Sequence, residues 1–390
     1  MIETQQLKPA RILVVDDEPD LELLVRQKYR REVREGHFDL SFARDGVHAL
    51  EILSGDPGIE IVLTDINMPR MDGLTLLGRI ADLDRLLKVV IVSAYGDMEN
   101  IRTAMNRGAF DFVTKPIDFD DLTTTIRKTH EEVLALRRAV ELQAQLSVLE
   151  RELDIASQIQ VSALPKAFPD RDEVQLHAKM IPALEVGGDF YDFFEVDEHR
   201  LGIAVGDVSG KGLGAAIFMA MTRSMVRSAG LQGMRPSECV RHVNRVLYPE
   251  SLPSMFVTIA CGVLDVLTGE LVYCLAGHNP PVIVGESGAR ELEGTGGLVV
   301  CAVPDFEFSD RTVRLGMGES LVLYSDGVTE ASDGSGGLFG SERLMASLQR
   351  LSRARPSEMI EAVLSDVRAF TSGSRQNDDI TMLALTYSGA

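Results

Sequence analysis

Short apolar runs alternate with amphipathic stretches over the first 125 residues. The β-branched runs at residues 12–15, 61–63 and 89–92 are typical of strands that are buried on both faces of a parallel sheet. Each run is soon followed by Asp, Pro or Gly and then by an amphipathic stretch, such as residues 21–29. This alternation of strand and helix predicts a doubly wound α/β domain over residues 9–125.

A different pattern fills residues 126–163, which contain no Gly and no Pro. Apolar residues recur there at alternating spacings of three and four, with a phase slip between Val140 and Leu142. We expect a long helix with an imperfect heptad stripe that ends at Leu164-Pro165. The alternative is a helix packed on its own domain, but the length favours a coiled-coil linker that pairs with a second copy of the chain. The stripe consists of Val133, Leu136, Val140, Leu142, Leu146, Leu149, Leu153 and Ala156.

The remaining segment, residues 164–390, is a Gly-rich mixture of short strands and helices. The strands are separated mostly by turns rather than by helices, which predicts antiparallel sheets and an α+β domain. Strands are expected at residues 201–205, 256–260, 271–275, 282–284, 321–324 and 382–386, and helices at 215–228, 236–247 and 356–369.

Composition excludes several classes of protein. The chain has 390 residues, 45% of them hydrophobic, which is enough for two or three globular domains. With 59 acidic and 39 basic residues, its net charge is −20, and such a chain is a poor candidate for nucleic-acid binding. The four cysteines have no CxxC spacing, so neither a zinc site nor a redox motif is indicated. No signal peptide and no apolar run of roughly 20 residues is present, and we expect a cytoplasmic protein without a membrane partner.

Polar residues with a common chemistry follow the predicted parallel strands. Asp16 and Asp17 come after the first strand, Asp65 after the second, Ser93 after the third, and Lys115 after residues 112–113. Because the carboxyl ends of parallel strands meet in one crevice, these side chains should lie together. Carboxylates are hard ligands for Mg²⁺, one of them can accept a phosphoryl group, and the lysine and hydroxyl can hold the phosphoryl oxygens. The alternative, that these Asp residues only cap helices, does not explain the accompanying serine and lysine.

The segments VVDDE, LTDINMPRMDG, VSAYG and FVTKP resemble the receiver domain of two-component response regulators. The resemblance implies that Asp65 is the phospho-acceptor and that a sensor histidine kinase or phosphotransfer protein supplies the phosphoryl group. It also implies a cis Lys115-Pro116 bond. Phe112 departs from the family, because its position is often Tyr and a phenyl ring forms no hydroxyl hydrogen bond. The implied Mg²⁺ ligands are Asp16, Asp17, Asp65 and the Asn67 carbonyl, with Ser93 and Lys115 as the switch hydroxyl and the cation.

Four separate acidic motifs lie in the C-terminal region, at residues 187–192, 206–212, 325–327 and 377–381. Glycine flanks the Asp in three of them, which allows the backbone to approach a ligand closely. Carboxylates and neighbouring carbonyls suit Mg²⁺ or Mn²⁺ rather than zinc. Such a set could hold two ions about 4 Å apart and activate a water for in-line attack on a phosphate. A phosphate-cradling loop is excluded at residues 206–212, because the GxxxxGK[ST] spacing is missing.

These motifs, with IASQIQVSALP, AGHNPP and LYSDGVTEA, resemble the metal-dependent PPM phosphatases of the SpoIIE and RsbU type over roughly residues 150–390. The resemblance implies an α-β-β-α sandwich and a site with two Mn²⁺ or Mg²⁺ ions. Gly214 stands where relatives often have Pro. His278 invites a role as a general acid, although a structural turn is the simpler interpretation. The implied ligands are Asp189, Asp207, the Val208 carbonyl, Asp326 and Asp378, with Asp379 less firmly assigned because Asn occurs there in eukaryotic members.

The combined hypothesis is a response regulator with a phosphatase output. Its parts are a receiver over residues 9–125, a helical coiled-coil linker over 126–163 that forms a homodimer, and a phosphatase domain over 164–390. In relatives the substrate is a phosphorylated STAS-domain anti-sigma-factor antagonist. The alternative is a non-enzymatic adaptor that binds an anti-sigma or sigma-pathway partner, and the presence of all four metal-ligand Asp residues counts against it. A DNA-binding output has no support, because no compact basic helix-turn-helix follows residue 163.

Overall fold

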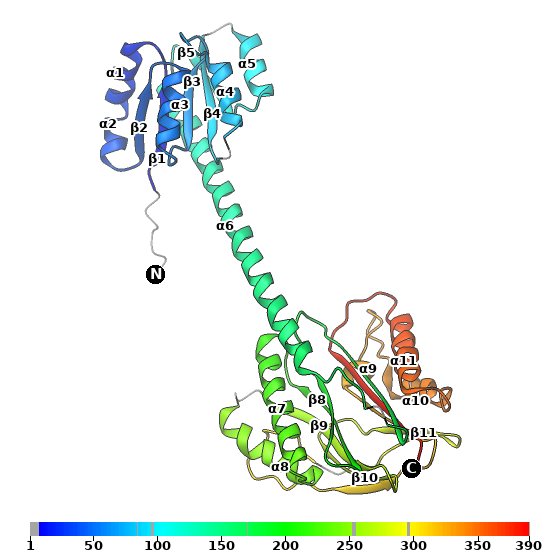
Figure 1. Cartoon of the computed structure of the whole chain (residues 1–390). Coiled ribbons are helices and arrows are strands. Elements are labelled where there is room, and N and C mark those ends of the chain that lie inside the picture. Colours follow the sequence, from blue (N-terminus) through cyan, green and yellow to red (C-terminus); the bar gives the residue numbers. More distant parts are fainter. Residues whose placement is uncertain are drawn as a thin grey trace. The chain divides into compact units, whose positions relative to one another are not determined.

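The computed structural model describes residues 8–83, 85–94, 97–169, 171–251, 255–294 and 297–389. The chain divides into two compact units after Val148, coloured blue to cyan and green to red in Figure 1. No described helix combines the length and the apolar character that a membrane crossing requires.

The N-terminal unit is built on a five-stranded parallel sheet. Its strand order is β2-β1-β3-β4-β5, which is a doubly wound topology and confirms the predicted fold class. The three apolar runs of the sequence lie within β1, β3 and β4. The strands are β1 (Ala10–Val15), β2 (Phe38–Ala43), β3 (Ile61–Asp65), β4 (Lys88–Ala94) and β5 (Asp111–Lys115).

Two apolar clusters cover the two faces of this sheet. In β1, Leu13 and Val15 belong to one cluster, and Ile12 and Val14 to the other. Burial on both faces explains why the strand is a continuous apolar run rather than an alternating one. The helices of the unit are α1 (Pro19–Lys28), α2 (Arg30–Arg34), α3 (Gly46–Gly55), α4 (Gly73–Ala81), α5 (Met98–Asn106) and the first part of α6.

A single helix of 45 residues, α6 (Phe119–Ala163), contains the predicted linker. It begins before residue 126 because Asp118 caps it, accepting a hydrogen bond from the amide of Asp120 at 2.8 Å. Leu122 and Ile126 of its first turns are buried in the core of the N-terminal unit. The apolar stripe is exposed further along, with Leu146 and Leu149 each 52% exposed.

The C-terminal unit contains two five-stranded antiparallel sheets. Their orders are β13-β10-β9-β8-β7 and β12-β11-β14-β15-β6. The first sheet contains β7 (Phe190–Glu195), β8 (Arg200–Val208), β9 (Val257–Asp265), β10 (Glu270–Ala276) and β13 (Arg311–Arg314), and the second β6 (Val174–Ile181), β11 (Val282–Gly285), β12 (Gly288–Glu291), β14 (Ser320–Tyr324) and β15 (Ile380–Tyr387).

Helices cover both outer faces, as the predicted α-β-β-α sandwich requires. Figure 1 shows α7 and α8 on one side of the sheets and α10 and α11 on the other. One large cluster fills the space between the sheets and beneath α7 and α8, and a second lies under α10 and α11. These helices are α7 (Leu213–Leu231), α8 (Pro236–Leu247), α9 (Asp326–Thr329), α10 (Gly340–Gln349) and α11 (Pro356–Thr371), with a 3-10 turn at Tyr248–Glu250.

Candidate functional sites

The first site lies at the carboxyl end of the parallel sheet. The side chains of Asp16, Asp17 and Asp65 each offer an oxygen atom, and these atoms all lie within 4.8 Å of one another. Lys115, the last residue of β5, places its Nζ 2.9 Å from Asp16 Oδ2 and 2.9 Å from Asp65 Oδ2. The strand-end convergence expected from the sequence therefore brings these four side chains together.

The charges of this pocket suit a divalent cation. Burial disfavours the charged form of Lys115, but the hydrogen bonds to Asp16 and Asp65 outweigh it and raise the lysine pKa. One ammonium opposite three carboxylates leaves a net negative charge. Hard oxygen donors with a negative balance fit Mg²⁺.

The loop after β3 fixes Asp65. Its Oδ1 accepts a hydrogen bond from the amide of Ile66 at 2.7 Å, and the residue is only 7% exposed. Gly73 lies against the Asp65 carbonyl, since a Cβ at this position would come within 2.1 Å of that oxygen. Gly73 is therefore needed for the close approach of the two segments, a role that the sequence reading did not assign to it.

The other expected residues of the first site come from β4, β5 and the loop after β3. Ser93 is the penultimate residue of β4 and is fully buried, with its Oγ 3.4 Å from Asp97 Oδ2. Asn67 is exposed in the loop after β3, and Phe112 is 36% exposed on β5. The predicted cis bond between Lys115 and Pro116 is present. Residues 95 and 96 of the VSAYG motif lie outside the described residues.

The second site gathers carboxylates from both sheets of the C-terminal unit. Asp189 precedes β7 and Asp207 lies near the end of β8, while Asp326 begins α9 and Asp378 precedes β15. Asp189 and Asp207 lie close enough to affect each other's pKa, and Asp207 is also near enough to Asp326 and Asp378 for their charges to raise its pKa. In the described part of the chain, only Asp16, Asp17 and Asp65 form a group of three carboxylates within 4.8 Å. The carboxylates of the second site instead interact pair by pair, through the charges that shift each other's pKa.

Crowding and burial shift the acidities of this second set. Burial, followed by repulsion from Asp207, raises the pKa of Asp189 well above its usual range. Burial and the neighbouring Asp326 raise the pKa of Asp207 to about 7, and burial with Glu330 and Asp378 raises the pKa of Asp326. Asp189 Oδ2 is buried and has no hydrogen-bond partner. Cations would relieve both the repulsion and this unpaired oxygen, and oxygen donors without His or Cys fit Mg²⁺ or Mn²⁺.

Asp379 and Gln160 hold the loop that carries Asp189. The Asp379 carboxylate accepts hydrogen bonds from the amides of Ala183 (2.7 Å) and Gly188 (2.6 Å). Gln160 of α6 is buried and forms two hydrogen bonds with the backbone of Gly187. Its side chain donates to the Gly187 carbonyl at 2.5 Å and accepts from the Gly187 amide at 3.0 Å. The sequence reading missed Gln160, because its partner Gly187 lies 27 positions further along the chain.

The Gly187-Gly188 pair is explained by the space around it. A Cβ on Gly187 would lie 2.4 Å from Asp379 Oδ2, and one on Gly188 would lie 2.8 Å from the Val208 carbonyl oxygen. The Val208 carbonyl therefore lies beside the loop of Asp189. Lys211 pairs with the proposed ligand Asp378 at 3.2 Å and donates to the Asn377 carbonyl.

His278 and Asp192 are buried in structural contacts. His278 lies 2.7 Å from the Thr258 hydroxyl through Nδ1, and burial lowers its pKa to about 4. A histidine that is neutral over the physiological range favours the structural interpretation over a general acid. Asp192 is fully buried and pairs with Arg223 (3.2 Å) and Arg227 (2.6 Å) of α7, which ties β7 to the helix above it.

Two family models match the chain. The model for the response regulator receiver domain matches residues 12–127, and the model for stage II sporulation protein E (SpoIIE) matches residues 197–388. The chain is 39% identical to the chemotaxis protein CheY of Treponema pallidum over 28% of its own length and 75% of that protein. These matches fall on the two units that contain the two sites.

Further relatives match a larger share of the chain. The chain is 33% identical to protein IcfG of Synechocystis, covering 60% of this chain and 41% of that protein. It is 28% identical to phosphoserine phosphatase RsbU of Bacillus subtilis, covering 61% and 70% respectively. The SiaA-PP2C domain of Pseudomonas aeruginosa has the same fold, with a TM-score of 0.55 at 24% identity over 63% of this chain and 99% of that one. The chain thus spans less than half of the length of IcfG. It belongs to the response regulators, as one in which a receiver domain is joined to a SpoIIE-type phosphatase domain of the PPM class.

Proposed function

We propose that phosphorylation of Asp65 controls a metal-dependent phosphatase that removes phosphate from phosphoserine or phosphothreonine in a protein. One observation carries the proposal: a pocket of three carboxylates around Lys115 and a second gathering of buried carboxylates occur in the same chain. The similarity to RsbU, a phosphoserine phosphatase, supports the class of substrate. The boundaries proposed for the three parts are residues 9–125, 126–163 and 164–390.

In the receiver, Asp65 is the proposed nucleophile. One of its carboxylate oxygens forms a bond to the phosphorus of the donor, and the bond from phosphorus to the donor's leaving group breaks. Asp16, Asp17, Asp65 and the Asn67 carbonyl would hold Mg²⁺, which supplies positive charge to the phosphoryl oxygens. Lys115 and Ser93 hold those oxygens in the product. A sensor histidine kinase or a phosphotransfer protein is the proposed donor.

In the phosphatase domain, the proposed ligands of two Mn²⁺ or Mg²⁺ ions are Asp189, Asp207, the Val208 carbonyl, Asp326 and Asp378. Such ions polarise a water and neutralise charge on the phosphate. Asp379 supports the ligand set because its carboxylate accepts hydrogen bonds from the amides of Ala183 and Gly188, and the remaining lone pairs of that carboxylate make it a further, less firmly assigned ligand. The proposed substrate is a phosphorylated STAS-domain anti-sigma-factor antagonist.

The metal site is tested by removing one ligand. Asp326→Ala should lower the turnover of p-nitrophenyl phosphate with Mn²⁺ by roughly a hundredfold or more, because a group that stabilises charge in the transition state is lost. The matched control is Asp305→Ala, since Asp305 is exposed and has no hydrogen bond or ion pair within the described residues. Equal turnover in both variants would remove Asp326 from the ligand set, and no metal-dependent turnover in the wild-type chain would leave an adaptor as the better account.

A further inference from the structure

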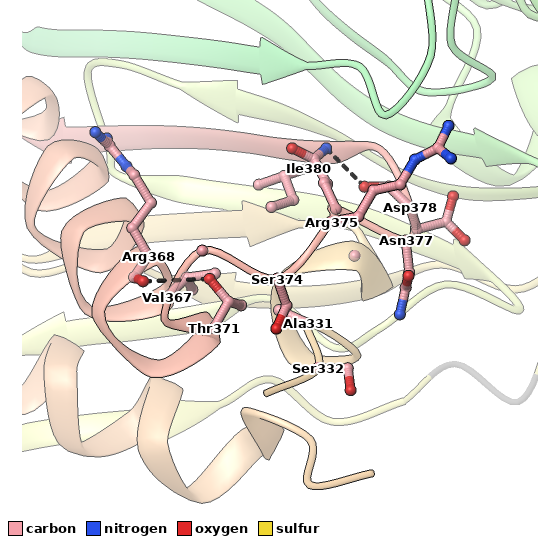
Figure 2. Close-up of a pocket in the computed structure, with 13 residues that line it drawn as sticks. Ala331, Ser332, Val367, Arg368, Thr371, Ser374, Arg375, Asn377, Asp378 and Ile380 are labelled. Carbon is pink, nitrogen blue, oxygen red and sulfur yellow. Dashed lines mark hydrogen bonds between the residues drawn. The ribbon is translucent and has the colours of Figure 1, made fainter. Parts of the chain in front are cut away.

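A hollow of about 360 Å³ opens next to the phosphatase carboxylates (Figure 2). It lies between the end of α11, the segment that leads into β15, and the turn after α9. Asp378 and Gly327 line the hollow, and Gly327 directly follows Asp326. A molecule held at the carboxylates would therefore extend past the mouth of this hollow.

The walls of the hollow have two kinds of chemistry. Val367, Ile380 and Ala331 supply a buried apolar surface. Thr371 and Ser374 supply hydroxyl groups on one side, where Figure 2 shows them next to each other and the Ser374 amide donates to the Thr371 carbonyl at 2.9 Å. An apolar interior with a few polar groups at the rim is typical of a ligand-binding site.

Arg375 adds a positive charge at the same rim. Its side chain has no hydrogen bond or ion pair with any residue that the structure describes, whereas Arg368 across the hollow donates to the Leu364 carbonyl at 3.2 Å. Figure 2 shows the Arg375 guanidinium and the Asp378 carboxylate on the same side of the segment. In a chain with a net charge of −20, an unpaired guanidinium beside an acidic centre is positioned to meet an anion.

We propose that this hollow is a recognition site for the phosphoprotein substrate. An aliphatic side chain next to the phosphorylated residue enters the hollow, and Arg375 contacts an anionic group of the same segment. The occupant is a protein chain, because successive side chains of an extended segment lie about 3.3 Å apart per residue and can reach the carboxylates and the adjoining hollow together. This inference rests on the proposed phosphatase function and adds the feature by which the site selects its substrate.

The test compares phosphoserine peptides that differ at one flanking position, Leu against Gly, placed in turn at each of the three positions on either side. With the Mn²⁺-loaded full chain, we expect kcat/KM to favour Leu by about tenfold at one or two positions, the fold-change expected for burying one aliphatic side chain. Dissociation constants from fluorescence anisotropy should show the same preference. Equal values for Leu and Gly at all six positions would overturn the proposal.

Two variants locate the preference. Ser374→Trp fills the hollow and should abolish the preference for Leu, while Arg353→Trp places the same ring in the exposed loop between α10 and α11 and should leave it intact. A preference that survives Ser374→Trp, in a variant that unfolds at the wild-type temperature, would contradict the assignment. Arg375→Glu should raise KM for the phosphopeptides several-fold, and an unchanged KM would remove Arg375 from the site.

The outcome is separable from that of the proposed function. Hydrolysis of p-nitrophenyl phosphate reports on the metal centre alone, because this compound has no flanking residues. If that activity is present and the peptides show no preference, the recognition site is wrong and the phosphatase assignment stands. If that activity is absent, the phosphatase assignment is wrong, and the anisotropy measurement still decides whether the hollow selects peptides.

Discussion

Lys115 is the residue that balances the charges of the receiver pocket. Its ammonium lies 2.9 Å from the carboxylates of both Asp16 and Asp65, and these contacts keep it protonated. The same ammonium is available to a phosphoryl group on Asp65, because the lysine side chain remains 22% exposed. Asp65 is also held in place by a hydrogen bond that its carboxylate accepts from the Ile66 amide.

The assignment of Asp65 is tested by labelling. Asp65→Asn should abolish incorporation of phosphate from a small phosphodonor with Mg²⁺, because the amide is not a nucleophile for phosphorus. The control is Asp20→Asn, which changes an exposed carboxylate on α1 of the same unit. Undiminished labelling of Asp65→Asn, as measured by intact-protein mass spectrometry, would show that another residue is the acceptor.

At the scale of single elements, the end of α6 contacts the catalytic domain through the buried side chain of Gln160. Gln160 forms hydrogen bonds with both the carbonyl and the amide of Gly187, which lies two positions before the proposed ligand Asp189. Asp379 holds the next residue of the same loop. The position of Asp189 therefore depends on the end of the linker helix and on the start of β15.

Loss of the Gln160 contacts should loosen the metal site. Gln160→Ala should weaken Mn²⁺ activation of the full chain by roughly 10- to 100-fold, the usual effect of removing a group that orients a ligand. Gln158→Ala is a matched control, because Gln158 is exposed on the same helix and, among the residues described, its side chain bonds only to Asp154. The readout is the Mn²⁺ concentration for half-maximal activity, and identical values for the two variants would contradict a positioning role for Gln160.

The spacing of apolar residues was sufficient to predict the strands and helices that are buried and bounded by turns. The buried runs of β1, β3 and β4 and the helix α8 (Pro236–Leu247) follow directly from their apolar spacing. The strand β7 was not predicted, because its residues were read only as part of an acidic motif and Asp192 is paired by arginines that are remote in sequence. The early start of α6 was missed because Asp118 follows a proline-containing turn and its capping role depends on backbone geometry. Contacts between distant segments, such as that of Gln160 with Gly187, have no local signature in one sequence.

At the scale of the whole molecule, α6 is the element that both units share. Its first turns contribute Leu122 and Ile126 to the core of the N-terminal unit, and its last turns contribute Gln160 to the phosphatase domain. Between them lie exposed apolar residues such as Leu142 and Leu146, which are 59% and 52% exposed. We propose that a second copy of the chain covers this stripe and forms a parallel coiled-coil homodimer. Two or three buried Leu per chain would contribute about 1.5–3 kcal/mol each, which suits a reversible dimer.

The dimer is tested by charging the stripe. Leu149→Asp combined with Leu153→Asp should shift the chain toward monomer in sedimentation velocity experiments, because buried carboxylates would face each other. Glu150→Asp with Glu152→Asp is the control, since both residues lie on the exposed surface of the same turns. A double variant that sediments as a dimer and still responds to receiver phosphorylation would show that the linker is only a tether.

The central claim is that the state of Asp65 sets the activity of the phosphatase. The most direct measurement is the rate of p-nitrophenyl phosphate hydrolysis by the full chain with Mn²⁺, before and after treatment with a phosphodonor, in the wild type and in Asp65→Asn. The account predicts a rate change of several-fold on phosphorylation in the wild type and no change in the variant. Equal wild-type rates in the phosphorylated and unphosphorylated states, with phosphorylation verified by mass spectrometry, would contradict it.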